Sequence, residues 1–96
     1  MKKVFQLTHP KIKPARLADS IRSEVKRYVQ RERRKELPEG ADFWDFDCRF
    51  GVSEEEATKV HELDLPKCIV AAEEQGLESF YIEILAKPGI RTAKQD

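Results

Sequence analysis

The stretch that decides the fold is FWDFDCRFG, residues 43–51. Its apolar residues alternate with charged ones, and this period of two predicts a β-strand with one buried face. The residues expected to point into the core are Trp44, Phe46, Cys48 and Phe50. Those expected on the opposite face are Asp45, Asp47 and Arg49. Because large aromatic side chains bury the most apolar area, this strand should be the centre of the core.

A helix is predicted before this strand, beginning at Pro14, which suits a first helical turn because its missing N–H is not needed there. Apolar residues then recur every three or four positions, at Leu17, Ala18, Ile21, Val25, Tyr28 and Val29. Because this stripe stops at Val29, the segment RERRKE, residues 31–36, is expected to extend beyond the core. Pro38 and Gly40 then end the helix in a turn.

Three further elements follow from similar patterns. Residues 2–8, KKVFQLT, alternate like a first strand. Asp64 as N-cap, Pro66 in the first turn and the terminating Gly76 predict a second helix. The last strand lies in LESFYIEILAKPG, residues 77–89, with Phe80, Ile82 and Ile84 facing inward and Tyr81, Glu83 and Leu85 facing outward.

The segment between residues 52 and 63 is compatible with two structures. Ser53 followed by Glu56 forms a capping-box pattern, which favours a short helix from residue 54. TKVHEL, residues 58–63, also reads as a strand that pairs with residues 43–50 across a loop. We favour the strand.

The predicted element order is β-α-β-β-α-β. This order predicts an α+β fold of the two-layer ferredoxin-like type, with two helices on one face of an antiparallel sheet. The alternative has three strands and an extra short helix at 54–61. With 96 residues the chain is long enough for one domain, which we expect at 1–88, followed by a flexible C-terminal tail at 89–96.

The net charge is zero, but the charge is unevenly distributed along the chain. Residues 1–36 contain twelve Lys or Arg and four Asp or Glu, whereas residues 37–96 contain six and fourteen. Such asymmetry is typical of a surface that binds a polyanion, and equally of a molecule that binds its own copies. No apolar run approaches the roughly 20 residues of a membrane span, and the start lacks a secretory apolar region. We therefore expect a soluble, cytoplasmic protein without a membrane partner.

The basic residues of the first helix and the loop before it are candidate phosphate contacts. Lys or Arg near a helix C-terminus also stabilise the helix dipole, but this explains only the last turn. Arginine predominates over lysine within the helix, which suits bidentate phosphate contacts. The candidates are Lys11, Lys13, Arg16, Arg22, Lys26, Arg27, Arg31, Arg33, Arg34 and Lys35. A solvated charged helix face is the competing interpretation.

A second group of candidates lies on the sheet face that points away from the helices. Paired carboxylates can serve acid–base chemistry or hold a hard cation, although alternating strand residues that face solvent are usually charged in any case. The candidates are Asp45, Asp47, Arg49, His61, Tyr81 and Glu83. The face lacks the paired aromatic residues on which RNA-recognition modules stack bases.

Catalytic and metal-binding motifs are missing from the sequence. The two cysteines, Cys48 and Cys68, lie too far apart for a Cys-x-x-Cys pair and are expected to be buried free thiols. The serines have no nucleophile context, and four glycines form no phosphate-binding loop. We therefore expect no enzyme activity, no cofactor and no metal.

Four segments, FQLTHPKIKPARL, RERRKELPEG, FWDFDCRFG and ESFYIEILAKPG, resemble those of a family of small bacterial proteins of unknown function. The resemblance covers nearly the whole chain. It implies a bacterial, cytoplasmic, single-domain protein, and it brings no activity, cofactor or catalytic residue.

These observations predict a small binding module whose basic first helix contacts the phosphates of nucleic acid or of a ribonucleoprotein. The alternative is a protein-interaction or self-association domain, such as a homodimer, in which the basic helix meets an acidic surface.

Overall fold

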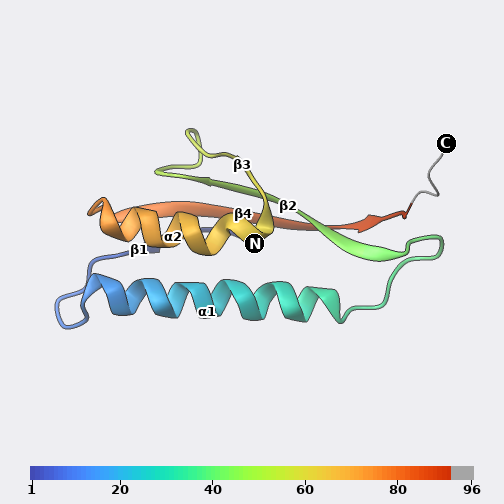
Figure 1. Ribbon diagram of the computed structural model, residues 1–96, viewed down its shortest axis with the longest axis horizontal. Coiled ribbons are helices and arrows are strands. Elements are labelled where there is room, and N and C mark those ends of the chain that lie inside the picture. Colours follow the sequence, from blue (N-terminus) through green and yellow to red (C-terminus); the bar gives the residue numbers. More distant parts are fainter. Residues whose placement is uncertain (92–96) are drawn as a thin grey trace.

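The computed structural model of the protein describes residues 1–91 (Figure 1). The helical elements are α1 (Pro14–Arg33), the short 3-10 helix η1 (Glu62–Asp64) and α2 (Leu65–Glu74). The strands are β1 (Lys2–Gln6), β2 (Phe43–Gly51), β3 (Thr58–Val60) and β4 (Ser79–Gly89). The predicted order β-α-β-β-α-β is therefore confirmed.

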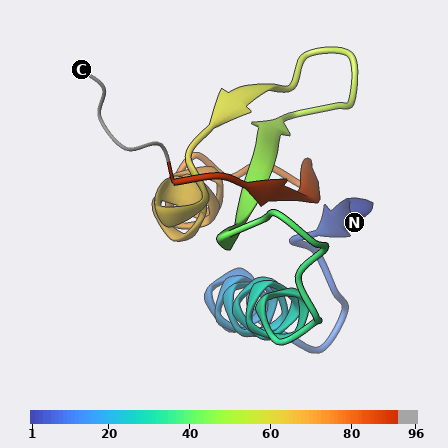
Figure 2. The same ribbon diagram turned by 90° about the vertical axis from the view of Figure 1, so that its right-hand side faces the viewer.

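The strands form one four-stranded antiparallel sheet with the order β1-β4-β2-β3. Strand β4 lies between β1 and β2, and β2 lies between β4 and β3, so each long helix connects two strands that are separated by a third. Seen end-on, both helices lie on the same side of the sheet (Figure 2). The two-layer α+β arrangement is confirmed, and its central strands are β4 and β2.

The core lies between the helices and one face of the sheet. Cross-strand register places Cys48 opposite Ile84 and Phe50 opposite Ile82, so the inward residues of β2 and β4 form continuous rows. Phe46, Cys48, Phe80, Ile82 and Ile84 are buried as the alternating pattern predicted, whereas Trp44 and Phe50 are partly buried against the same cluster. Strand β1 and the residue after it contribute Phe5 and Leu7, and the helices contribute Ala18, Ile21, Val25, Val29, Leu65, Ile69 and Ala72.

The C-terminal end of α1 makes tertiary contacts that its sequence pattern does not predict. The helix ends at Arg33, and the long strand β2 passes beside its last turns. The indole N–H of Trp44 donates to the Lys35 carbonyl at 2.9 Å, and the Arg33 guanidinium lies 5.0 Å from the centre of the Phe46 ring. No residue of 31–36 belongs to the core, as the pattern predicts, but Trp44 and Phe46 of β2 contact this segment.

The segment between β2 and α2 differs most from the structure predicted from the sequence. Ser53 Oγ accepts from the Glu56 N–H at 3.3 Å, as in a capping box, but the contact closes a turn rather than starting a helix. The alternative of three strands with a helix at 54–61 is wrong. The favoured strand is present but ends at Val60, because His61 caps η1 through its Nδ1, which accepts from the Leu63 N–H at 3.1 Å.

The chain remains packed beyond residue 88. Strand β4 includes Gly89, whose carbonyl accepts from the Asp42 N–H at 2.9 Å. The Arg91 N–H donates to the Asp42 carboxylate at 2.7 Å. Residues 92–96 of the predicted tail lie outside the described residues. Among residues 1–91, neither helix is both long enough and apolar enough to cross a membrane.

Candidate functional site

One stripe of α1 points away from the sheet and carries Arg16, Arg27, Arg31 and Arg34. At 3.6 residues per turn these positions lie within about 60° of one another, roughly opposite the buried residues of the helix. All four side chains are exposed. These four side chains therefore share one outward surface.

Lys11 and Lys13 extend this surface into the loop before α1. His9 Nδ1 accepts from the Lys11 N–H at 3.0 Å and shapes the turn, and both lysines are exposed. Lys13 is the N-cap residue of α1, and no acidic residue follows in the first turn. The positive end of the helix dipole therefore reinforces the lysines. We call Lys11, Lys13, Arg16, Arg27, Arg31 and Arg34 the cation row.

The remaining basic candidates of the helix lie elsewhere. Arg22, Lys26 and Arg33 line a groove of about 610 Å³ between α1 and the η1–α2 segment. Its apolar lining includes Leu63, which is 72% exposed, and its acidic lining residues are Asp19 and Glu62. The structure thus places nine of the ten candidates on two surfaces, and the tenth, Lys35, follows the end of the helix.

Ion pairs also distinguish the cation row from most of the other candidates. Arg22 pairs with Asp19, Arg33 with Glu62 at 2.7 Å, and Lys35 with Glu32 at 2.9 Å. None of the six residues of the cation row forms an ion pair with another residue in the range 1–91. The cation row is therefore available for an external anion, whereas three of the other four candidates neutralise carboxylates of the protein itself.

The carboxylates on the open face of the sheet do not converge. Asp47 pairs with Lys87 at 2.9 Å, and this contact raises the pKa of the lysine. Asp45 accepts from the Phe46 N–H at 2.9 Å. Register places Asp47 opposite Leu85 and Arg49 opposite Glu83, so Glu83 belongs to a different row of the sheet. The carboxylate partner of Arg49 is Glu83 and neither of the two aspartates.

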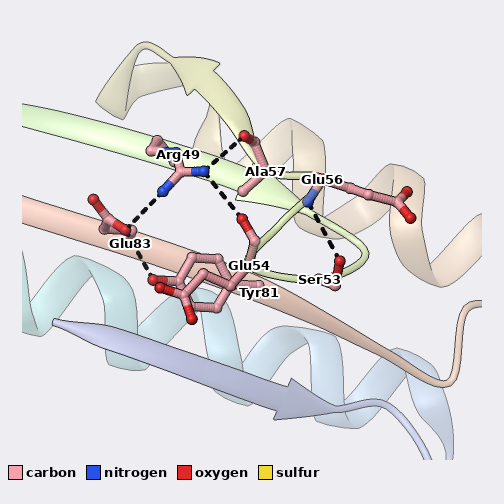
Figure 3. Close-up of polar contacts among 7 residues, drawn as sticks. All are labelled: Arg49, Ser53, Glu54, Glu56, Ala57, Tyr81 and Glu83. Atoms are coloured by element: carbon pink, nitrogen blue, oxygen red, sulfur yellow. Dashed lines mark hydrogen bonds and ion pairs between the residues drawn. The ribbon is translucent and has the colours of Figure 1, made fainter.

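Three of the open-face candidates do form a network, together with the loop 52–57 (Figure 3). The Arg49 guanidinium donates to Glu83 at 3.1 Å and to the carbonyls of Glu54 and Ala57, both at 3.0 Å. The Tyr81 hydroxyl donates to the same Glu83 oxygen at 2.8 Å. We call Arg49, Tyr81, Glu83 and the two loop carbonyls the Arg49 network.

The Arg49 network shifts the pKa values of Tyr81 and Glu83 in opposite directions. The hydrogen bond from Tyr81 is the main cause that lowers the pKa of Glu83, and Arg49 acts in the same direction against the effect of burial. Burial, followed by the hydrogen bond to Glu83, raises the pKa of Tyr81 to about 12. At neutral pH the site thus contains a neutral phenol, a carboxylate and a guanidinium, all engaged with one another.

The burial of Tyr81 and Glu83, at 4% and 7% exposed, was not predicted, because alternation assigned them to an open face. Gly51 shows how closely the loop approaches the sheet, since a Cβ at this position would lie 2.6 Å from the Ala57 Cα. The small residues at both ends of the loop were the only sequence signal for this contact. The network is thus built to hold the loop on the sheet.

Neither His61 nor the cysteines add a reactive group to the open face. His61 lies after β3 and caps η1, so the prediction that it faces the open sheet is wrong. Cys48 is buried, which raises its pKa to about 11, and Cys68 is half-buried with a raised pKa for the same reason. Within residues 1–91, no cluster of three or more His, Cys, Asp or Glu has the arrangement of a metal site.

Comparisons with known proteins identify the family of the chain but assign no function to it. They found no match among curated proteins and none among solved structures. A family model described as a family of unknown function, DUF6172, matches residues 1–95. The resemblance seen in the sequence is thereby confirmed at the level of the family, and the chain belongs to this family of unknown function.

Proposed function

We propose that the protein binds the phosphate backbone of nucleic acid through the cation row. The observation that carries the proposal is the contrast in ion pairing on α1. Arg22 and Arg33 pair with carboxylates, whereas the six cations of the row are exposed and form no ion pair within residues 1–91. Cations left unpaired on one side of the molecule are the electrostatic footprint expected of backbone contacts.

The rest of the molecule supports backbone contacts rather than base recognition. Backbone contacts position a protein on nucleic acid without reading its sequence. The row has arginines at four of its six positions, and arginine forms planar, bidentate bonds to phosphate. On the open sheet face Tyr81 is buried and bonded to Glu83, so it offers no ring for base stacking. Binding should therefore depend on charge and salt with little sequence preference.

The test is fluorescence anisotropy with labelled DNA and RNA at 50 and 200 mM salt. The variant Arg27→Gln/Arg31→Gln/Arg34→Gln removes three charges of the row and keeps good helix formers. The control Lys59→Gln/Lys67→Gln/Lys87→Gln removes the same charge from exposed positions outside the row. We expect the row variant to reduce the log–log salt slope by about 3, since each lost phosphate contact contributes about 0.9.

The control should keep both the affinity and the slope of the wild-type protein. Equal losses in the two variants would mean that only net charge matters and would contradict a defined site. Absence of binding by the wild-type protein at 50 mM salt would contradict the proposal outright.

A second copy of the chain is the alternative ligand for the row. Glu54, Glu55 and Glu56 are exposed on the loop 52–57, and the loop between β2 and β3 lies on the other side of the sheet from α1 (Figure 2). A contact between the row of one copy and this loop of the next would be head-to-tail. Sedimentation at the same two salt concentrations separates the alternatives, because self-association would give a larger species at 50 mM that dissociates at 200 mM.

A further inference from the structure

The cation row is not continuous but has two ends with a gap between them. Lys11, Lys13 and Arg16 form an N-terminal cluster, and Arg27, Arg31 and Arg34 form a C-terminal cluster. Arg16 and Arg27 are eleven residues apart, which corresponds to about 16 Å along the helix axis at 1.5 Å per residue. The exposed residues of the same stripe within the gap are Ser20 and Ser23.

The carboxylates near the gap are not free to repel a phosphate. Asp19 pairs with Arg22, and Glu24 pairs with Lys3 at 2.8 Å. The middle of α1 therefore presents small hydroxyl side chains flanked by neutralised acids. Two groups of cations separated by such a segment fit two phosphate backbones better than they fit one.

We infer that the ligand is double-stranded and that α1 lies across one of its grooves, with one cluster on each strand. This inference rests on the proposed function. The major groove of B-DNA is about 12 Å wide and admits an α-helix. Clusters about 16 Å apart can reach the phosphates on both sides of such a groove, while Ser20 and Ser23 face its interior. The wide minor groove of an RNA duplex offers the same pair of backbones.

The aromatic residues argue against a single-stranded ligand. Proteins that bind single strands stack bases on exposed aromatic rings beside a basic path. All eight aromatic residues fall within residues 1–91, and four of them, Phe5, Phe46, Phe80 and Tyr81, are buried. A fifth, Phe50, packs on Phe80 at 5.1 Å between ring centres.

The three remaining rings are also occupied. Trp44 is half-buried and tied to Lys35 by its N–H, and the Arg31 guanidinium lies 5.7 Å from the centre of the half-buried Tyr28 ring. Phe43 lies against Gly89, with the Arg91 guanidinium 5.9 Å from its ring centre. The described structure thus offers no open stacking platform next to the cation row.

The spacing between the clusters is fixed by the fold. The four buried residues Ala18, Ile21, Val25 and Val29 attach α1 to the core over the whole gap. The contacts of Trp44 and Glu62 with Lys35 and Arg33 hold its C-terminal end. A rigid pair of clusters selects a ligand whose two phosphate rows are also at a fixed separation, which is a property of a duplex.

The experiment compares a 20-base-pair duplex with an unstructured 40-nucleotide single strand, which carry closely matched numbers of phosphates, using both DNA and RNA. If six phosphates are contacted, duplex affinity should fall on the order of a thousandfold between 50 and 200 mM salt. A single strand that meets only one cluster should lose about twentyfold, since its slope is about −0.7 per contact. Comparison of the DNA and RNA duplexes identifies which groove geometry fits.

Two matched variants test the role of each cluster. Lys11→Gln/Lys13→Gln/Arg16→Gln and Arg27→Gln/Arg31→Gln/Arg34→Gln should each reduce the duplex salt slope by about half. The inference is overturned, with the proposed function intact, if the single strand binds as tightly and with as steep a slope as the duplex. It is also overturned if the N-terminal variant leaves the slope unchanged. If neither nucleic acid binds at 50 mM salt, the proposed function fails as well.

Discussion

Replacing Arg49 by Met should release the loop 52–57 from the sheet and destabilise the whole domain. Methionine keeps most of the length and apolar contact of the side chain but removes all three of its hydrogen bonds. The change leaves Glu83, which is 7% exposed, without its ion-pair partner. It also leaves the Ala57 carbonyl without its donor.

The expected loss in the free energy of unfolding depends on how exposed each hydrogen bond of Arg49 is. The bonds to Glu83 and Ala57 are part-buried and should contribute about 1 to 1.5 kcal/mol each, whereas water can replace the exposed bond to Glu54. We therefore expect the free energy of unfolding to fall by about 2 to 3 kcal/mol. Breaking a fully buried pair costs about 3 to 5 kcal/mol. The expected loss is smaller because the Arg49 side chain is 37% exposed.

Urea unfolding monitored by circular dichroism measures this loss, which corresponds to a decrease of about 10 to 20 °C in Tm for a domain of this size. The matched control is Arg22→Met, which removes an exposed pair and should cost less than about 1 kcal/mol. The double variant Arg49→Met/Glu83→Gln should be at least about 1 kcal/mol less destabilised than the sum of its single variants. Equal stability of Arg49→Met and Arg22→Met, or full additivity, would refute the argument.

Three further predictions concern the Arg49 network and the loop 52–57. The pKa of Tyr81 is raised from 10.0 to about 12, so the unfolded state loses this proton first and stability should fall as pH rises above 10. The pKa of Glu83 is lowered from 4.5, so the unfolded state gains a proton first and stability should fall as pH drops below 4.5. Urea midpoints across pH check both. Tyr81→Phe should reduce the alkaline loss, and the remainder comes from Cys48 and Cys68, whose pKa values are also raised. A variant that still loses the same stability above pH 10 would show that Tyr81 is not responsible. Gly51→Ala places a Cβ 2.6 Å from the Ala57 backbone and should cost about 1 to 3 kcal/mol by urea unfolding. Gly89→Ala, which meets only the movable Phe43 ring, should cost less, and the reverse order would contradict the close packing of the loop.

The parts of the fold that follow from local periodicity were predictable. Phe80, Ile82 and Ile84 alternate along β4 and are buried where the period of two predicts them. The helical period likewise places Arg27 and Arg34 on one outward stripe, because a buried apolar stripe fixes the phase of every other side chain.

What could not be predicted depends on contacts between distant segments. Tyr81 and Glu83 follow the same alternation but are buried, because the loop 52–57 folds back and donors on Arg49 hold it there. The helical period puts Arg33 and Arg34 on different flanks of the helix, but the ion pair of Arg33 could not be predicted because its partner Glu62 is 29 positions away. Local patterns therefore identified the basic helix. The pairs of Arg22 and Lys35 are local, at i,i+3, whereas the pair of Arg33 depends on the tertiary structure.

The segment RERRK, residues 31–35, contains two residues of the cation row, Arg31 and Arg34, and its tertiary contacts bear on how they would meet the phosphates that we propose as ligands. A solvated helix end needs no tertiary support, yet Arg33 is bonded to Glu62, and the Lys35 carbonyl accepts from Trp44. Both contacts come from other elements and fix the backbone of the last turn. Arg31 and Arg34 then project from an ordered backbone, so binding a phosphate there requires less loss of conformational entropy than binding to a frayed end. The contacts of Arg33 and Lys35 within the protein thereby position Arg31 and Arg34, which form no ion pair within residues 1–91.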